Sequence, residues 1–133
     1  MSEHESEIKS VTKTWAESFN SHDAAALAAL YAKDAVLWGT LSAELTSTPN
    51  GVRQYFDAAC NSPMALTVVF DQQLIRGCGD LMLNSGTYTF SFERDGKRQT
   101  FPARFSMAFK SDRGRWLIVD HHSSGVPTVP KTS

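Results

Sequence analysis

Two adjacent histidines near the end of the chain, His121 and His122, are the residues best suited to chemistry, and Asp120 directly precedes them. A histidine can accept or donate a proton near neutral pH, and a carboxylate partner fixes its tautomer and raises its basicity. The pattern indicates either acid–base catalysis or, with no catalytic role, hydrogen bonds that close a final strand and hold a subunit contact. Adjacent strand residues point to opposite faces, so only one histidine can act on a given substrate, and alternation favours His121 beside Ser123.

The other reactive side chains predict neither a metal nor a cofactor. Histidines that point apart do not form a ligand pair, and His4 and His22 lie in a predicted tail and a predicted turn. Cys60 and Cys78 have no metal-ligand spacing and no basic neighbour that would mark a nucleophile. The segment from Gly77 to Gly79 is a tight turn, because a dinucleotide loop would need a third glycine and a following helix.

Length and charge narrow the class of protein. The 133 residues (14.7 kDa) predict a single domain over residues 1–133. A net charge of −1 argues against a nucleic-acid partner, which would need a basic face. No apolar run reaches the ~18 residues of a membrane span, and no signal-peptide pattern opens the chain. Two cysteines are too few for a disulfide scaffold, so we expect a cytoplasmic protein. Because the chain has no membrane-spanning run, we also expect no membrane partner.

The first half of the chain predicts three helices. Apolar residues spaced by three and four from Ile8 to Phe19 predict the first helix, preceded by a frayed acidic segment over residues 2–7. The second helix begins at Ala24, and a short strand over residues 35–38 follows it. Thr48-Pro49 predicts the start of the third helix. The buried faces of the last two helices comprise Leu27, Leu30 and Tyr31, and then Val52, Tyr55, Phe56 and Ala59.

After Pro63 the spacing changes to that of strands. Strands are predicted over residues 66–75, 81–93, 99–110 and 115–122, with turns at 77–80, 94–97 and 112–114. The central Asp95-Gly96 pair is typical of a two-residue hairpin turn. Three helices followed by a four-stranded antiparallel meander, with one early strand, predict an α+β fold.

Alternation assigns two faces to the last two strands. The apolar face should pack on the helices and carries Phe101, Ala103, Phe105, Met107, Phe109, Leu117, Val119, His121 and Ser123. The mixed face should meet a partner subunit through Arg104, Trp116, Asp120 and His122, with Ile118 beside them. On it an Arg104–Asp120 ion pair across the strands, or an anion site shared between subunits, is expected. A β-bulge would swap the assignment, so His121 and His122 could exchange roles.

Three segments carry a resemblance to a known superfamily. Phe19–Asp23 and Leu30–Val36 resemble the start of nuclear-transport-factor-2-like domains. Gly114–Pro127 resembles the bacterial relatives of the calcium/calmodulin-dependent protein kinase II association domain, the SnoaL-like group often labelled SgcJ/EcaC. The resemblance covers residues 8–128. It implies a cone-like fold, in which three N-terminal helices pack on a curved, mostly antiparallel sheet enclosing a cavity. It also implies homodimers, or larger rings, built through the outer face of the sheet.

The chain departs from this superfamily at two known functional clusters. Steroid isomerase relatives carry a general-base aspartate just after the first strand, where this chain has Trp38-Gly39-Thr40. The kinase association domain holds small carboxylates with arginines, and the corresponding positions here are Thr87, Met107 and Ser123. Neither the catalytic carboxylate nor the cationic clamp is present at these positions, so the fold alone does not specify the activity.

The remaining hypothesis is a cavity for a partly apolar small molecule. The expected lining comprises Trp15, Tyr31, Trp38, Tyr55, Thr87, Phe105, Met107 and Ser123, although aromatic residues at helical spacing are more often plain core. A homodimeric small-molecule-binding domain is the leading interpretation. One alternative is a cofactor-free isomerase, cyclase or dehydratase acting on a polyketide-like or steroid-like substrate. In that case His121 would be the acid/base, assisted by Tyr31 or Ser123. Another alternative is a self-association module.

Overall fold

The computed structural model describes residues 3–127, and its helices and strands follow the predicted order. A four-stranded antiparallel meander follows three helices and one early strand, which confirms the α+β fold. The elements are α1 (Glu3–Asn20), α2 (Ala24–Ala28), β1 (Tyr31–Trp38), α3 (Pro49–Cys60), β2 (Thr67–Cys78), β3 (Leu81–Arg94), β4 (Lys97–Asp112) and β5 (Arg115–Gly125).

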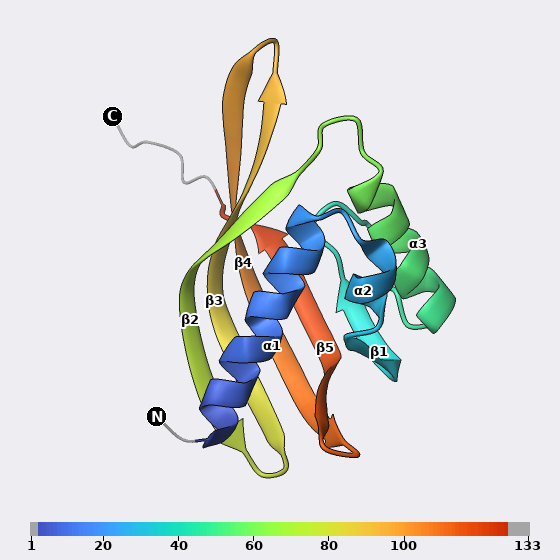
Figure 1. Cartoon of the computed structure of the whole chain (residues 1–133), viewed down its shortest axis with the longest axis vertical. Coiled ribbons are helices and arrows are strands. Elements are labelled where there is room, and N and C mark those ends of the chain that lie inside the picture. The colour runs from blue at the N-terminus through green and yellow to red at the C-terminus, as the bar shows by residue number, and fades with distance from the viewer. Residues whose placement is uncertain (1–2, 128–133) are drawn as a thin grey trace.

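The five strands form one sheet in the order β1-β5-β4-β3-β2. Only the β1–β5 pairing is parallel, and it joins the early strand to the last one. The long strands bend around α1, which lies along one face of the sheet, while α2 and α3 lie toward the β1 side (Figure 1). The core lies between α1 and this face. No helix in residues 3–127 is long and apolar enough to cross a membrane.

Helix α1 begins earlier than predicted. It buries one stripe, Ile8, Thr12, Trp15 and Phe19, as the spacing indicates. The expected frayed segment is instead helical from Glu3, so that prediction was wrong. Glu3 and Glu5 lie in the first turn, where the helix dipole favours negative charge. Glu7 accepts a 2.8 Å hydrogen bond from Trp116 Nε1, which ties the first turns to β5.

The second helix ends sooner than predicted. It stops at Ala28, and Tyr31 is already the first residue of β1 rather than part of a helical face. The reason is tertiary, because the Leu30 carbonyl accepts a 2.8 Å hydrogen bond from the Ile118 amide. The chain has therefore joined the sheet before another helical turn can form. The third helix starts as predicted, with Thr48 Oγ1 accepting from the Gly51 amide at 3.0 Å.

Two-residue turns join the long strands. Asp95 and Gly96 both have positive φ (54° and 74°), as do Arg113 and Gly114 (53° and 81°), which is the geometry of type I′ hairpin turns. The turn predictions are confirmed. Strand β2 pairs with β3 only as far as Ser91. Residues 92–99 therefore extend past β2 as a two-stranded arm, here called the projecting hairpin, which is visible at the top of Figure 1.

A β-bulge in β5 decides which residues face the core. Phe109 pairs with Ile118 but Ala108 pairs with Asp120, so Val119 is an extra residue. Ile118 therefore points inward and is fully buried. Strict alternation had placed Trp116 and Ile118 outside and Leu117 and Val119 inside, and the bulge reverses this assignment. Because the bulge precedes the histidines, His121 stays inside and His122 outside, as alternation favoured.

Candidate functional site

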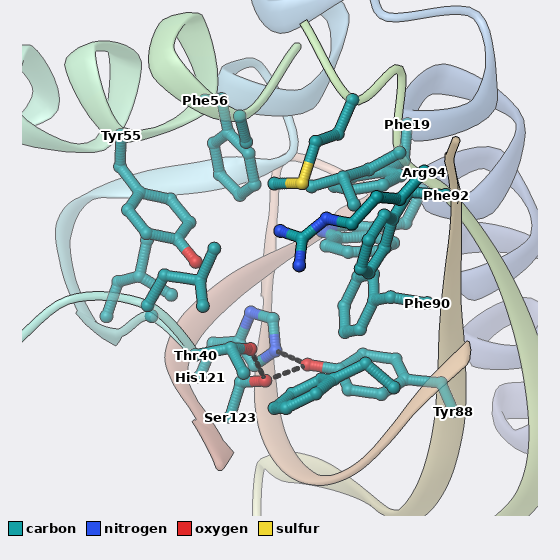
Figure 2. A pocket seen from close by; sticks show the side chains of 18 residues that line it. Phe19, Thr40, Tyr55, Phe56, Tyr88, Phe90, Phe92, Arg94, His121 and Ser123 are labelled. Atoms are coloured by element: carbon teal, nitrogen blue, oxygen red, sulfur yellow. Dashed lines mark hydrogen bonds between the residues drawn. The ribbon is translucent and has the colours of Figure 1, made fainter. Parts of the chain in front are cut away.

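A cavity of about 270 Å³ opens between α1, α3 and the inner face of the sheet. Its wall is mostly aromatic and aliphatic, and Thr40, Tyr88, His121 and Ser123 bring their polar groups together at one end (Figure 2). The lining residues are Trp15, Phe19, Leu37, Gly39, Thr40, Leu41, Tyr55, Phe56, Ala59, Met64, Leu66, Tyr88, Phe90, Phe92, Arg94, Phe101, His121 and Ser123.

The polar end is a continuous chain of hydrogen bonds. His121 Nε2 lies 3.2 Å from the Tyr88 hydroxyl, which donates to Ser123 Oγ at 2.5 Å. Ser123 Oγ in turn hydrogen-bonds Thr40 Oγ1, which the β1–α3 loop supplies. On the other side of the imidazole ring, Nδ1 lies 2.8 Å from the Tyr31 hydroxyl. Four separate segments thus meet around one buried histidine.

The direction of these hydrogen bonds fixes the tautomer of His121. The single hydroxyl proton of Tyr88 goes to Ser123, so His121 Nε2 must carry a proton and donate it to the Tyr88 oxygen. Nδ1 then accepts from the Tyr31 hydroxyl, whose oxygen accepts from Trp15 Nε1 at 3.0 Å. Both ring nitrogens are therefore satisfied without a charge.

Burial keeps this network neutral. It lowers the pKa of His121 from 6.5 to about 3, with a smaller contribution from the charge of His122. Burial also raises the pKa of Tyr88 and that of Tyr31 above the ordinary value of 10. At neutral pH the imidazole and both phenols are uncharged. The cluster therefore offers a ligand oriented hydrogen bonds rather than a charge.

Comparison with known proteins places this architecture in a family. The SnoaL-like domain model matches residues 8–129 of the chain. The chain belongs to the SnoaL-like family. No curated protein matches its sequence.

Solved structures share the fold of this SnoaL-like domain. A candidate calcium/calmodulin-dependent protein kinase II association domain from Xanthomonas campestris is 29% identical, with a TM-score of 0.83 over 92% of this chain and 88% of that chain. A candidate dehydratase of the NTF2-like family from Streptomyces avermitilis is 12% identical, with a TM-score of 0.82 over 92% and 96%. The hub of the calcium/calmodulin-dependent protein kinase II from S. rosetta is 17% identical, with a TM-score of 0.79 over 91% of this chain and 95% of that chain.

The SnoaL-like domain brings together only part of the predicted lining. Trp15, Tyr55 and Ser123 line the cavity together with His121. Three other predicted lining residues, Tyr31, Phe105 and Met107, are buried but are not among the lining residues.

Trp38 and Thr87 do not face the cavity, which corrects the prediction for both. Within β1 the side chain of Leu37 points inward, so Trp38 is 38% exposed and lies beside His122, with ring centroids 6.4 Å apart. Within β3 the inward place belongs to Tyr88, and Thr87 pairs with the exposed Arg104. The side chain predicted to point inward was therefore one residue out of phase with the strand.

Sequence reasoning missed most of the lining residues, among them Thr40, Tyr88, Phe90 and Arg94. Tyr88, Phe90 and Phe92 alternate along β3, and this period-2 aromatic pattern could have identified the inner face. Thr40 gave no local signal, because its hydrogen-bond partner Ser123 is 83 residues away.

The outer face of the sheet carries three of the four predicted subunit contacts. Arg104, Asp120 and His122 are exposed there, whereas the bulge turns Trp116 toward Glu7 of α1. The expected Arg104–Asp120 pair does not form, because Arg104 lies opposite Ser124 and Asp120 opposite Ala108. Within residues 3–127 no cluster of three histidine, cysteine or acidic side chains could hold a metal ion.

Proposed function

We propose that this SnoaL-like domain is a homodimeric protein that binds a small, largely apolar molecule in its cavity. The observation that carries the proposal is an aromatic-walled cavity that ends in a neutral, oriented hydrogen-bond cluster. Such sites take most of their affinity from apolar contact and their orientation from a few polar groups. Its two cysteines, Cys60 and Cys78, are free thiols, which supports a reducing cytoplasmic setting.

The walls and the polar end have separate tasks in this proposal. Trp15, Phe56 and Phe90 would take the flat faces of a ring system, since burial of apolar surface contributes about 25 cal/mol per Å². At the polar end, Thr40 and Ser123 would meet a hydroxyl or carbonyl oxygen of the ligand. The volume of about 270 Å³ suits a molecule of two or three rings.

Blocking the cavity should abolish binding of a neutral fluorescent probe, N-phenyl-1-naphthylamine. Ala59 of α3 lines the cavity, so Ala59→Trp would fill the space with an indole ring. We expect the probe to bind the wild type with increased fluorescence, and the variant to bind more than ~10-fold more weakly, because each 1.4 kcal/mol lost costs a factor of ten. Fluorescence titration measures the dissociation constant of the probe for each protein.

Ala58→Trp is the matched control, because Ala58 is the exposed neighbour on the same helix. It adds the same indole outside the cavity and should leave the dissociation constant within a factor of two of the wild type. Equal loss of binding in both variants, or no probe binding to the wild type, would count against a cavity site.

The homodimer would form through the outer face of the sheet. One cross-strand row runs over all five strands, with exposed apolar ends and small serines in its middle: Leu74, Ser85, Ser106, His122 and Trp38. Leu74 is 58% exposed and Trp38 38%. Small central residues would let a second sheet approach closely, and apolar contact surface is what subunit interfaces bury. The hub and association-domain names of its structural relatives support self-association.

Ser106→Glu should convert the dimer to monomers. The substitution puts a charge at the centre of the exposed row, where close approach of two copies would bury two carboxylates without partners. We expect sedimentation equilibrium to give twice the 14.7 kDa chain mass for the wild type and one chain mass for the variant. Thr100→Glu on β4, opposite Ser91 and away from the row, should stay dimeric. A monomeric wild type would refute the interface, and a large ring would favour the self-association module.

An acid–base enzyme is the second candidate. It is favoured by the buried His121 next to Tyr88 in the cavity wall, and a structural relative bears the name of a dehydratase. With both nitrogens engaged and its pKa near 3, His121 would act as a neutral hydrogen-bond partner of Tyr88 in the resting protein. Turnover of a substrate that His121→Gln abolishes, with probe binding retained, would favour the enzyme over the binding protein.

A further inference from the structure

We propose that the ligand of this cavity is an aromatic acid whose carboxylate binds Arg94 at the mouth. The inference rests on the proposed binding function and specifies its ligand class.

Arg94 gives the cavity its charge. It is the one lining residue that is ionised at neutral pH, because no acidic side chain of residues 3–127 lines the cavity and His121 is neutral. The ion pairs of the described residues join His4 to Glu7 and Arg53 to Asp57, so Arg94 has no carboxylate partner there. A guanidinium beside apolar walls attracts an anion, and the cavity supplies none of its own.

The projecting hairpin holds this cation over the opening. Arg94 is the last residue of β3, in the part of the hairpin that β2 does not reach. Its guanidinium carbon lies 5.9 Å from the centroid of the Phe92 ring, and Phe92 and Phe101 also line the cavity. In Figure 2 the guanidinium is directed toward the interior of the cavity. The aromatic ring therefore steadies a side chain that would otherwise extend into solvent.

The two ends of the cavity thus differ in what they can recognise. A guanidinium presents paired N–H donors that match the two oxygens of a carboxylate. Between Arg94 and the Thr40–Ser123–Tyr88 cluster the wall is aromatic, which suits the body of a planar ring system. A molecule with rings in the middle and a carboxylate at one end would satisfy every part of the lining.

A matched pair of compounds isolates the charge. 6-Hydroxy-2-naphthoate and 6-hydroxy-2-naphthamide have nearly the same shape, but only the first is an anion at pH 7. Each would be titrated by calorimetry and by displacement of N-phenyl-1-naphthylamine. We expect the wild type to bind the acid about tenfold more tightly than the amide. This ratio is at the lower end of what a charge-assisted hydrogen bond contributes, because Arg94 is exposed to solvent. Added salt should weaken the binding of the acid and leave the binding of the amide unchanged.

Arg94→Gln should remove this preference and leave the affinity for the amide within a factor of two. Arg98→Gln is the control, because it removes the same charge from the facing strand of the hairpin, where Arg98 Nη2 donates to Ser91 Oγ at 3.1 Å. That variant should keep the preference.

The possible failures are distinguishable. Equal binding of acid and amide to the wild type, or a preference that survives Arg94→Gln, would overturn the aromatic-acid inference and leave the binding function intact. Probe binding that neither compound can displace would also overturn it. Absence of any probe binding to the wild type would overturn the proposed function itself, and this inference with it.

Discussion

Acidification from pH 7 to pH 4 should lower the free energy of unfolding by about 3 kcal/mol through His121 alone. The imidazole is buried between two tyrosine hydroxyls, and its pKa falls from 6.5 to about 3 on folding. Between these two values the unfolded chain binds a proton that the folded protein does not bind. Stability from this group is therefore complete above pH 6.5 and is lost progressively as the pH falls toward 3.

Urea unfolding at several pH values measures this effect. Between pH 6.5 and pH 5, above the range where carboxylates dominate, the contribution of His121 should approach 1.4 kcal/mol per pH unit. The His121→Gln variant should be less stable than the wild type at pH 7, because the substitution disturbs hydrogen bonds to Tyr31 and Tyr88. Its unfolding free energy should depend less steeply on pH, because the contribution of the imidazole is missing.

His122→Gln is the control for this measurement. His122 is exposed on the opposite face, and its charge is the smaller cause of the shift in His121. The pH dependence of this variant should stay close to that of the wild type. A wild-type protein whose stability is flat from pH 6.5 to pH 5 would contradict a buried neutral His121.

Gly86→Ala should be among the most destabilising single substitutions in the sheet, at about 3 kcal/mol or more. A Cβ atom at Gly86 would lie 1.8 Å from the Gln72 carbonyl oxygen and 2.6 Å from its carbon. The register of β2 shifts between Phe70 and Gln72, which pair with Tyr88 and Thr87, and Gly86 follows directly as the partner of Gln73. Because the obstacle is backbone, no side-chain rotation relieves it, and β2 would have to separate from β3.

Gly77→Ala in β2 provides the comparison. Its nearest new neighbour would be Met82 Sδ at 3.6 Å, an ordinary contact, so the change in unfolding free energy should stay within about 0.5 kcal/mol. Chemical denaturation of both variants beside the wild type measures the difference. Similar stabilities for the two alanine variants would show that the strands adjust around residue 86.

Local patterns were sufficient to predict most of the elements. The stripe of α1, the cap at Thr48 and the turn at Asp95-Gly96 depend on residues close in sequence, and the structure confirms them. The early end of α2 depends instead on a hydrogen bond between Leu30 and Ile118, which no local pattern contains.

The site was harder to predict than the fold, because irregularities within the strands determine which side chains face the cavity. One extra residue at Val119 exchanged the faces of Trp116 and Leu117, and a one-residue error of phase put Thr87 in the place of Tyr88. Strand alternation has a period of two, so one extra residue inverts the assignments on one side of it, which here is the side before the bulge. His121 was assigned correctly because it lies after the bulge and within the same run as Ser123.

The parallel pairing of β1 with β5 also has a consequence for how the protein folds. The meander β2–β5 is made of neighbouring hairpins, whereas Tyr31 and His121 are 90 residues apart and Thr40 and Ser123 are 83 apart. Contacts between such distant residues form slowly, because a long loop must close first. We therefore expect β1 to dock last, after β5 has emerged from the ribosome. Partly folded chains would then have a sheet but would lack the lining that Leu37 and Thr40 supply. The proposed ligand would therefore bind and protect only molecules that have completed folding.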